Sequence, residues 1–128
     1  MTYEPASNRL VGSIFLVHNI KYMLGKRFEK ELEMVSNALE NEQGEKEFIK
    51  YITPFVESAV DKYIAEEKIS NIPRNLLIKA GWTHLHIALK KYKGRAEMMI
   101  NRKNDVYYFS TYFNWYIKQG ILEYLKTQ

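Results

Sequence analysis

Apolar side chains recur every three or four residues along most of the chain, and no stretch alternates between apolar and polar as a β-strand does. This period is typical of α-helices with one buried face. The first two amphipathic segments span about 11–25 and 28–39, and we expect Gly25 to end the first and Gly44 to break the chain after the second. The pattern predicts an all-α fold, a compact helical bundle of about five helices.

Two longer apolar patterns follow, over 46–64 and 77–92. Pro54 lies inside the first and should either kink the helix or start a new one. Gly81 lies inside the second, where glycine costs about 1 kcal/mol relative to alanine. Close packing against another helix is the expected reason for this glycine.

The last segment, 109–124, carries more aromatic rings than one buried face can use. We expect Ser110 to cap it. One row should face the core, and it consists of Phe113, Ile117, Ile121 (or Gly120) and Tyr124. A second row lies about half a turn away and consists of Tyr112, Trp115, Tyr116 and Gln119. Aromatic stripes are more often core packing, but rings beside cations and an amide also suit unpaired bases.

Composition narrows the class of protein. The 128 residues fit one domain, and 46% apolar with 27% charged residues is ordinary for a soluble globular chain. No apolar run approaches the roughly 20 residues of a membrane span, and no signal-peptide pattern is present. The absence of cysteine excludes disulfides and thiolate metal sites. We expect a cytoplasmic protein with no membrane partner.

The net charge of +4 is unevenly distributed. Residues 1–72 hold nine Lys/Arg against twelve Asp/Glu, whereas residues 73–128 hold ten against three. A net of −3 followed by a net of +7 indicates a polyanionic partner on one side of the molecule. A solvated lysine-rich face would give the same pattern.

Catalytic and metal-binding motifs are missing. The chain has no Gly-rich phosphate loop, GxSxG or HExxH. His84 and His86 are two residues apart, so on a helix they do not face each other and make a poor metal pair. We expect no enzyme, no metal site and no cofactor.

The string FSTYFNWYIKQGI at 109–121 resembles the promoter-melting segment of bacterial RNA polymerase sigma factors of the sigma-70 family, where the pattern is close to KFSTYAxWWIRQAI. The identical positions are Phe109, Ser110, Thr111, Tyr112, Trp115, Ile117, Gln119 and Ile121. Tyr116 stands for the second tryptophan and Lys118 for the arginine, while Phe113 for alanine is the one bulky departure.

Two further stretches extend the resemblance in the family's order. Residues 48–64 are similar to the first helix of sigma region 2, and 76–92 to the helix that in the family docks on the clamp coiled coil of the polymerase β′ subunit. The likeness covers about 46–126 as a sigma region 2-like domain. Residues 1–45 are expected to form N-terminal helices that pack on this core.

The resemblance implies a transcription initiation factor that recognises and melts promoter DNA as a subunit of RNA polymerase. The implied DNA-binding residues are Phe109, Thr111, Tyr112, Trp115, Tyr116, Lys118 and Gln119. Tyr112 would stack on a flipped adenine of the single-stranded minus-ten region, and Trp115 and Tyr116 would wedge at the upstream duplex edge. Gln119 would reach a base-pair edge, Lys118 would contact phosphate, and Thr111 and Phe109 would support the single strand. Flipping a base costs a few kcal/mol, and stacking on a ring returns about 1–3 kcal/mol.

Residues 93–108 form a longer and more basic connection than the family has. Its cations are Lys93, Arg95, Arg102 and Lys103. As a loop beside the aromatic helix, it could follow phosphates through these side chains, with Arg102 and Lys103 the residues selected for DNA binding. A mobile surface loop without such contacts is the simpler alternative.

The stretch that resembles the docking helix departs from the family at its polar positions. The family's Asp, Gln, Glu and Asn fall on Leu76, Lys79, Ala80 and Trp82. Losing these polar contacts should weaken docking on the β′ coiled coil. Either the partner surface has changed as well, or core polymerase is not held in the usual way.

Sigma factors normally continue into a helix-turn-helix domain beyond this region, so we expect either a fragment or a single-domain relative. One alternative function is a sigma-like interaction module, a decoy or adaptor that binds polymerase or a regulator without promoter recognition. Another is a general single-strand binder driven by the basic half.

Overall fold

The computed structural model describes residues 13–102 and 107–128. These residues form five α-helices and no strand, which confirms the all-α prediction. The helices are α1 (Ser13–Glu40), α2 (Glu42–Glu67), α3 (Arg74–Gly81), α4 (Leu85–Arg102) and α5 (Phe109–Lys126).

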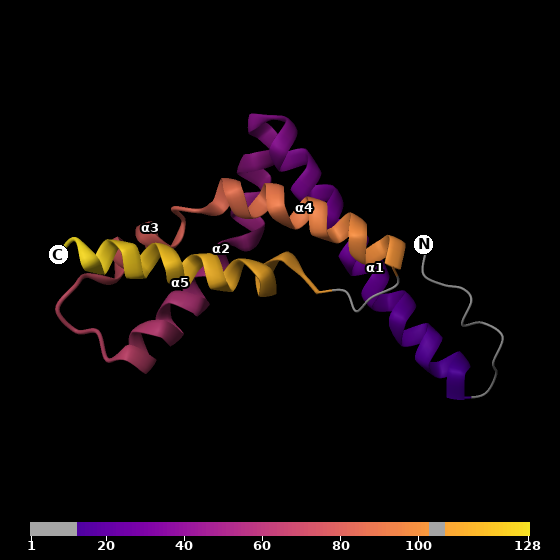
Figure 1. Cartoon of the computed structure of the whole chain (residues 1–128), viewed down its shortest axis with the longest axis horizontal. Coiled ribbons are helices and arrows are strands. Elements are labelled where there is room, and N and C mark those ends of the chain that lie inside the picture. The colour runs from indigo at the N-terminus through magenta and orange to yellow at the C-terminus, as the bar shows by residue number, and fades with distance from the viewer. Residues whose placement is uncertain (1–12, 103–106) are drawn as a thin grey trace.

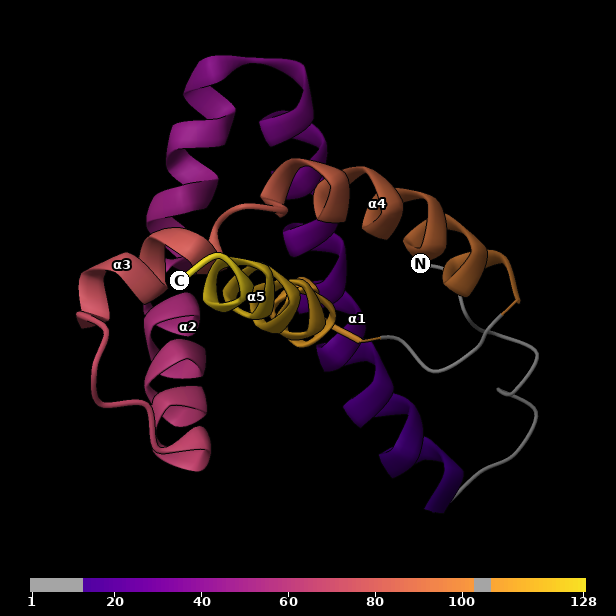
Figure 2. The same cartoon turned by 60° about the vertical axis from the view of Figure 1, so that its left-hand side comes forward.

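The aromatic helix α5 is the centre of the bundle. α1 and α2 fold back on each other as a hairpin, and α4 and α5 run side by side (Figure 1). Figure 2 shows α5 almost end-on, with α2 and α3 on one side of it and α4 on another. α5 packs against α2, α3 and α4, so its position depends on most of the molecule.

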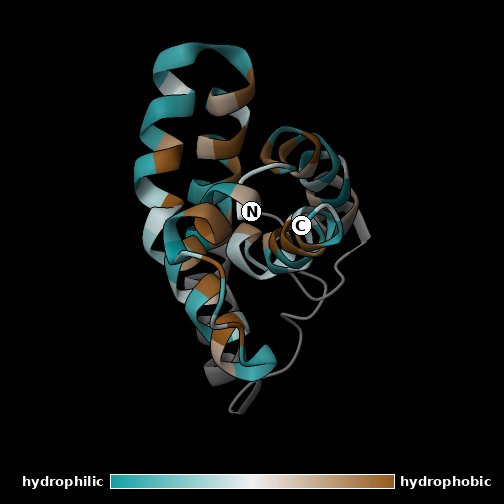
Figure 3. Ribbon diagram, turned by 90° about the vertical axis from the view of Figure 1, so that its left-hand side faces the viewer, coloured by the Kyte–Doolittle hydropathy of each residue, from teal (hydrophilic) through white to brown (hydrophobic). Residues whose placement is uncertain are grey.

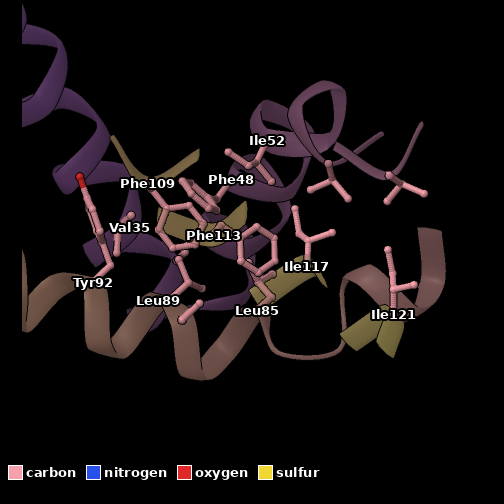
Figure 4. Packing of buried hydrophobic residues seen from close by; sticks show 14 of the residues in the cluster. Val35, Phe48, Ile52, Leu85, Leu89, Tyr92, Phe109, Phe113, Ile117 and Ile121 are labelled. Carbon is pink, nitrogen blue, oxygen red and sulfur yellow. The ribbon is translucent and has the colours of Figure 1, made fainter. Parts of the chain in front are cut away.

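Each described helix contributes apolar side chains to a single core, and the hydrophobic positions gather on the facing sides of the helices (Figure 3). Phe109 lies deep in this core (Figure 4). Its ring centroid is 5.2 Å from that of Phe48, 5.3 Å from Tyr92 and 5.2 Å from Phe113. Such ring clusters fix the start of α5 against α2 and α4 through burial and edge-to-face contacts.

The chain breaks between the first two helices differ from the prediction. α1 runs past Gly25 without interruption, and Gly44 lies inside α2. The turn is at Asn41, whose side chain accepts a hydrogen bond from the Gly44 amide at 2.7 Å and caps α2. A Cβ on Gly44 would lie 2.3 Å from the Asn37 carbonyl oxygen. This glycine therefore permits a close approach of α1 and α2.

The predicted helix over 77–92 is two helices, because α3 ends at Gly81 and α4 begins at Leu85. The Thr83 hydroxyl donates to the Ala80 carbonyl at 2.6 Å and closes the turn between them. A Cβ on Gly81 would lie 3.1 Å from a methyl of Ile117. Close packing was the expected reason for this glycine, and the structure confirms it.

Two further predictions concerned Pro54 and the connection over 93–108. α2 continues through Pro54, so no new helix starts there. Most of the predicted loop over 93–108 is helical, because α4 extends to Arg102. Residues 103–106 lie outside the described part of the chain.

The prediction that Ser110 caps α5 is wrong, since the helix begins at Phe109 with Tyr108 as its N-cap and no side-chain cap from it. The acceptor comes instead from α1. The buried carboxylate of Glu31 accepts a hydrogen bond from the Phe109 amide at 2.5 Å and another from the Tyr51 hydroxyl at 2.6 Å. A carboxylate at a helix N-terminus is stabilised by the helix dipole and by the unpaired amides there.

Candidate nucleic-acid interface

α5 has one buried row and one accessible row, as its sequence predicted. The buried residues are Phe109, Phe113, Ile117, Gly120 and Ile121. Of the second row, Trp115 is 59% exposed, and Tyr112, Tyr116 and Gln119 are half-buried. The expected core residue Tyr124 is also only half-buried. The ring-bearing face is thus accessible along its length.

The outermost stripe of α5 follows helical spacing and consists of Thr111, Trp115, Lys118 and Leu122. Thr111, Trp115 and Leu122 are exposed and Lys118 is half-buried. The Trp115 ring stands edge-on to Tyr116, with centroids 5.0 Å apart and an angle of 88°. An exposed indole supported in this way offers its faces to a planar ligand.

Phe109 is fully buried. Its ring can support the surface from beneath, by packing on Tyr92, but it presents no exposed face to a strand.

A cluster of tyrosines lies on the edge of α5 that faces α4. The Tyr107 and Tyr112 rings are stacked, with centroids 6.1 Å apart and an angle of 12°. The Tyr112 and Tyr116 hydroxyl oxygens are 3.3 Å apart. Tyr92, buried beneath, donates its hydroxyl to the Tyr107 carbonyl at 2.7 Å. Burial and the neighbouring Tyr116 raise the pKa of Tyr112, which keeps its phenol neutral.

A cation from α4 adjoins this cluster. The Arg95 guanidinium, on α4, lies 6.0 Å from the Tyr112 ring centroid. The pKa of Arg95 is raised by its electrostatic interaction with Tyr107 and by hydrogen bonding to that phenol, with Tyr112 adding to both effects. A guanidinium beside stacked rings can bind a phosphate while the rings contact a base.

Arg95 was expected as one of the cations of a loop over 93–108, whereas it lies on helix α4 beside the rings. Tyr107 was not selected for this site. Arg95 comes three residues after Tyr92, and the buried Ala96 continues the apolar period of α4 past Tyr92. Following that period beyond residue 92 would have placed Arg95 on the face next to the aromatic helix. Nothing in the local pattern indicated Tyr107.

Two other basic residues predicted in the connection, Arg102 and Lys103, have no described side chain. Arg102 ends α4, and its side chain is outside the described residues. Lys103 lies outside them altogether. The basic character of α4 itself is clear, since it holds five Lys/Arg against one Glu, whereas α2 holds three Lys against seven acids.

The four residues predicted to dock on polymerase come together at a second place, between α3 and the end of α5. Leu76, Lys79, Ala80 and Trp82 all line one open pocket of about 600 Å³. Leu76 is 37% exposed, Lys79 is exposed and Trp82 is half-buried, whereas Ala80 is only 7% exposed. Three of the four can therefore contact a partner through their side chains.

The far wall of this pocket belongs to α5 and includes Gly120 and Tyr124. Glu123 lies beside them and pairs with His84, with its carboxylate oxygen 2.8 Å from the imidazole Nε2. The pocket thus combines apolar walls with one lysine and one carboxylate.

Within the described residues no cluster of histidine and acidic side chains is arranged to hold a metal ion. None of the described helices is both long and apolar enough to cross a bilayer. Searches of known protein families, of curated proteins and of solved structures find no match to this chain.

Proposed function

We propose that this chain is a sigma-like promoter-binding domain that holds the single-stranded minus-ten region on the aromatic face of α5, as a subunit of RNA polymerase. The observation that carries the proposal is the exposure of Trp115 on a helix that is otherwise built into the core. A 59% exposed indole beside two half-buried tyrosines offers ring faces on which bases can stack.

The charge distribution supports the same proposal. Arg95 and Lys118 lie next to or among the rings, and the basic helix α4 runs alongside α5. Cations beside rings bind the sugar–phosphate chain without regard to sequence, while the rings contact bases. Figure 2 shows the acidic helix α2 on a different side of α5 from α4, so a polyanion is favoured on the α4 side.

The test is the affinity of the full chain for a short single-stranded DNA that contains a minus-ten element, measured by fluorescence anisotropy. A scrambled strand of the same composition is the reference. We expect the minus-ten strand to bind more tightly, and Tyr112→Ala to lower its affinity by about fivefold to 100-fold, the value of one stacked base. Equal affinity for both strands and for the variant would overturn the promoter-binding proposal and favour a general single-strand binder.

A second candidate function rests on the pocket between α3 and α5. A partially exposed leucine and tryptophan beside a lysine form a surface that suits a protein partner. The chain would then be an adaptor or decoy that binds polymerase or a regulator without promoter recognition. Co-purification with core polymerase that is lost in Leu76→Asp, without promoter-specific transcription, would favour this function.

A further inference from the structure

We infer that Tyr107 is an internal occupant of the base-binding surface, stacked where an incoming nucleobase would lie on Tyr112. The inference rests on the proposed function, and it adds a built-in competitor that lowers the affinity of the free protein for single strands.

The first argument is the geometry at Tyr112. The Tyr107 ring lies nearly parallel to the Tyr112 ring, at 12°, with centroids 6.1 Å apart. The buried Tyr92 ring lies 5.6 Å away at an angle of 49°. Of the rings around Tyr112, Tyr107 is the parallel one, whereas Tyr92 and Tyr116 are tilted to it. A base that stacks on the face of Tyr112 next to Tyr107 must therefore displace Tyr107.

The second argument is that Tyr107 is the ring that can leave. Tyr92 is fully buried and belongs to α4, whereas Tyr107 is half-buried and precedes the first turn of α5. Tyr107 is held at its backbone, where its carbonyl accepts the Tyr92 hydroxyl. This bond fixes the backbone, so the ring can leave by rotation of the side chain about its own bonds. That rotation gives up the stack on Tyr112 and the hydrogen bond between the phenol and the exposed Arg95.

The third argument concerns Arg95, which lies beside the Tyr107 and Tyr112 phenols. The guanidinium is exposed, so it can keep its place when Tyr107 moves and then face the phosphate of the bound nucleotide. Displacement of Tyr107 exchanges one ring for another on Tyr112 and releases Arg95 from one phenol.

The consequence is a quantitative prediction for affinity. A protein whose binding surface is occupied part of the time binds with an apparent Kd raised by the reciprocal of the open fraction. An aromatic pair contributes enough free energy to shift the equilibrium between the covered and the open surface by about two- to tenfold. Removing the Tyr107 ring should therefore tighten binding by about two- to tenfold, whereas removing a ring that belongs to the platform would weaken it.

The experiment measures the affinity of the full chain for the single-stranded minus-ten oligonucleotide, with Tyr107→Ala and Tyr107→Leu, the second of which preserves apolar volume in case the first does not fold. Tyr107→Phe keeps the stacked ring and loses the phenol beside Arg95, so it should bind more weakly than either of these variants. Tyr108→Ala is the matched control, because this neighbouring ring lies 3.8 Å from the Arg27 guanidinium on α1. We expect tighter binding for Tyr107→Ala and Tyr107→Leu alone.

A double-mutant comparison isolates the contact. In the Tyr112→Ala background, the gain from Tyr107→Ala should disappear, because no ring remains to be uncovered. Unchanged or weaker binding by both Tyr107→Ala and Tyr107→Leu would overturn the inference, as would an equal gain in Tyr108→Ala, which would indicate general loosening of the coil. If Tyr112→Ala binds like the wild type, the proposed function fails instead.

Discussion

Glu31 is the residue on which the position of the aromatic helix most depends. It is 1% exposed, and its two carboxylate oxygens accept from the Phe109 amide and the Tyr51 hydroxyl. These bonds join α1, α2 and the first residue of α5. A buried polar group of this kind stabilises a fold only when its partners are all present.

Glu31→Ala should lower the free energy of unfolding by about 2–4 kcal/mol, because the buried Phe109 amide and the half-buried Tyr51 hydroxyl lose their acceptor. Glu31→Gln keeps an acceptor for the Phe109 amide and should cost about 1 kcal/mol. Urea denaturation checks both values. The exposed Glu33 of the same helix supplies the control, and a Glu33→Ala variant as unstable as Glu31→Ala would contradict this role.

The Tyr51 phenol provides a pH-dependent test of the same link. Its burial, followed by its hydrogen bond to Glu31, raises the pKa of Tyr51 from 10.0 to about 12. Since the pKa in the folded state is above the unfolded value, the stability due to this phenol is complete below pH 10 and is lost as the pH rises towards about 12.

The measurement is the difference in unfolding free energy between the wild type and Tyr51→Phe as a function of pH. The other tyrosines titrate in both proteins, so their effect cancels in the difference. The wild type should be the more stable protein at neutral pH, and this advantage should shrink above pH 10. A difference that stays constant through this range would show that the phenol is not coupled to folding.

At the scale of elements, α3 and α5 cross so closely at Gly120 that there is no room for a side chain at this position. A Cβ on Gly120 would lie 2.3 Å from the Ala80 carbonyl oxygen, a backbone atom that cannot move aside alone. The same crossing forms the floor of the pocket between these helices. The glycine therefore sets both the packing and the pocket.

Gly120→Ala should destabilise the protein by about 1–3 kcal/mol, since the added methyl forces the two helices apart. Gly94 offers an opposite control inside α4, because a Cβ there would meet nothing within 4 Å. Gly94→Ala should stabilise by about 0.5–1 kcal/mol through helix propensity. Thermal unfolding distinguishes them, and a neutral Gly120→Ala would contradict the close crossing.

The helical segments and the buried rows on them follow from the spacing of apolar residues along the chain, and the sequence predicted both. The row of Phe113 and Ile117 faces the core, and the row of Trp115 remains accessible, because one period decides both. What the sequence could not supply was contact between distant segments. The cap of α5 comes from Glu31, 78 residues away, and so a local N-cap at Ser110 was the wrong choice.

The same reason explains what was missed at the candidate site. The split between α3 and α4 is a local turn, closed by the Thr83 hydroxyl on the Ala80 carbonyl, which the apolar period alone does not show. Arg95 joins the site only because α4 continues past Tyr92, and Tyr107 only because the chain returns along it.

At the scale of the whole molecule, the hairpin of α1 and α2 supports a helix whose other side is left accessible. α5 packs on α2, α3 and α4, yet Thr111, Trp115 and Leu122 of its outermost stripe are exposed. The acidic helix α2 and the basic helix α4 lie on different sides of it (Figure 2). The bundle therefore presents rings and positive charge together, which is the combination that single-stranded nucleic acids require.

The most direct test is tryptophan fluorescence, because the chain has only two tryptophans and they lie at the two candidate surfaces. Trp82→Phe leaves Trp115 as the single reporter on the aromatic face, and Trp115→Phe leaves Trp82 in the pocket. On titration with the single-stranded minus-ten oligonucleotide, Trp115 emission should be quenched by base stacking and Trp82 emission should stay constant. Quenching of neither tryptophan, or of Trp82 alone, would contradict the account that bases bind on the exposed rings of α5.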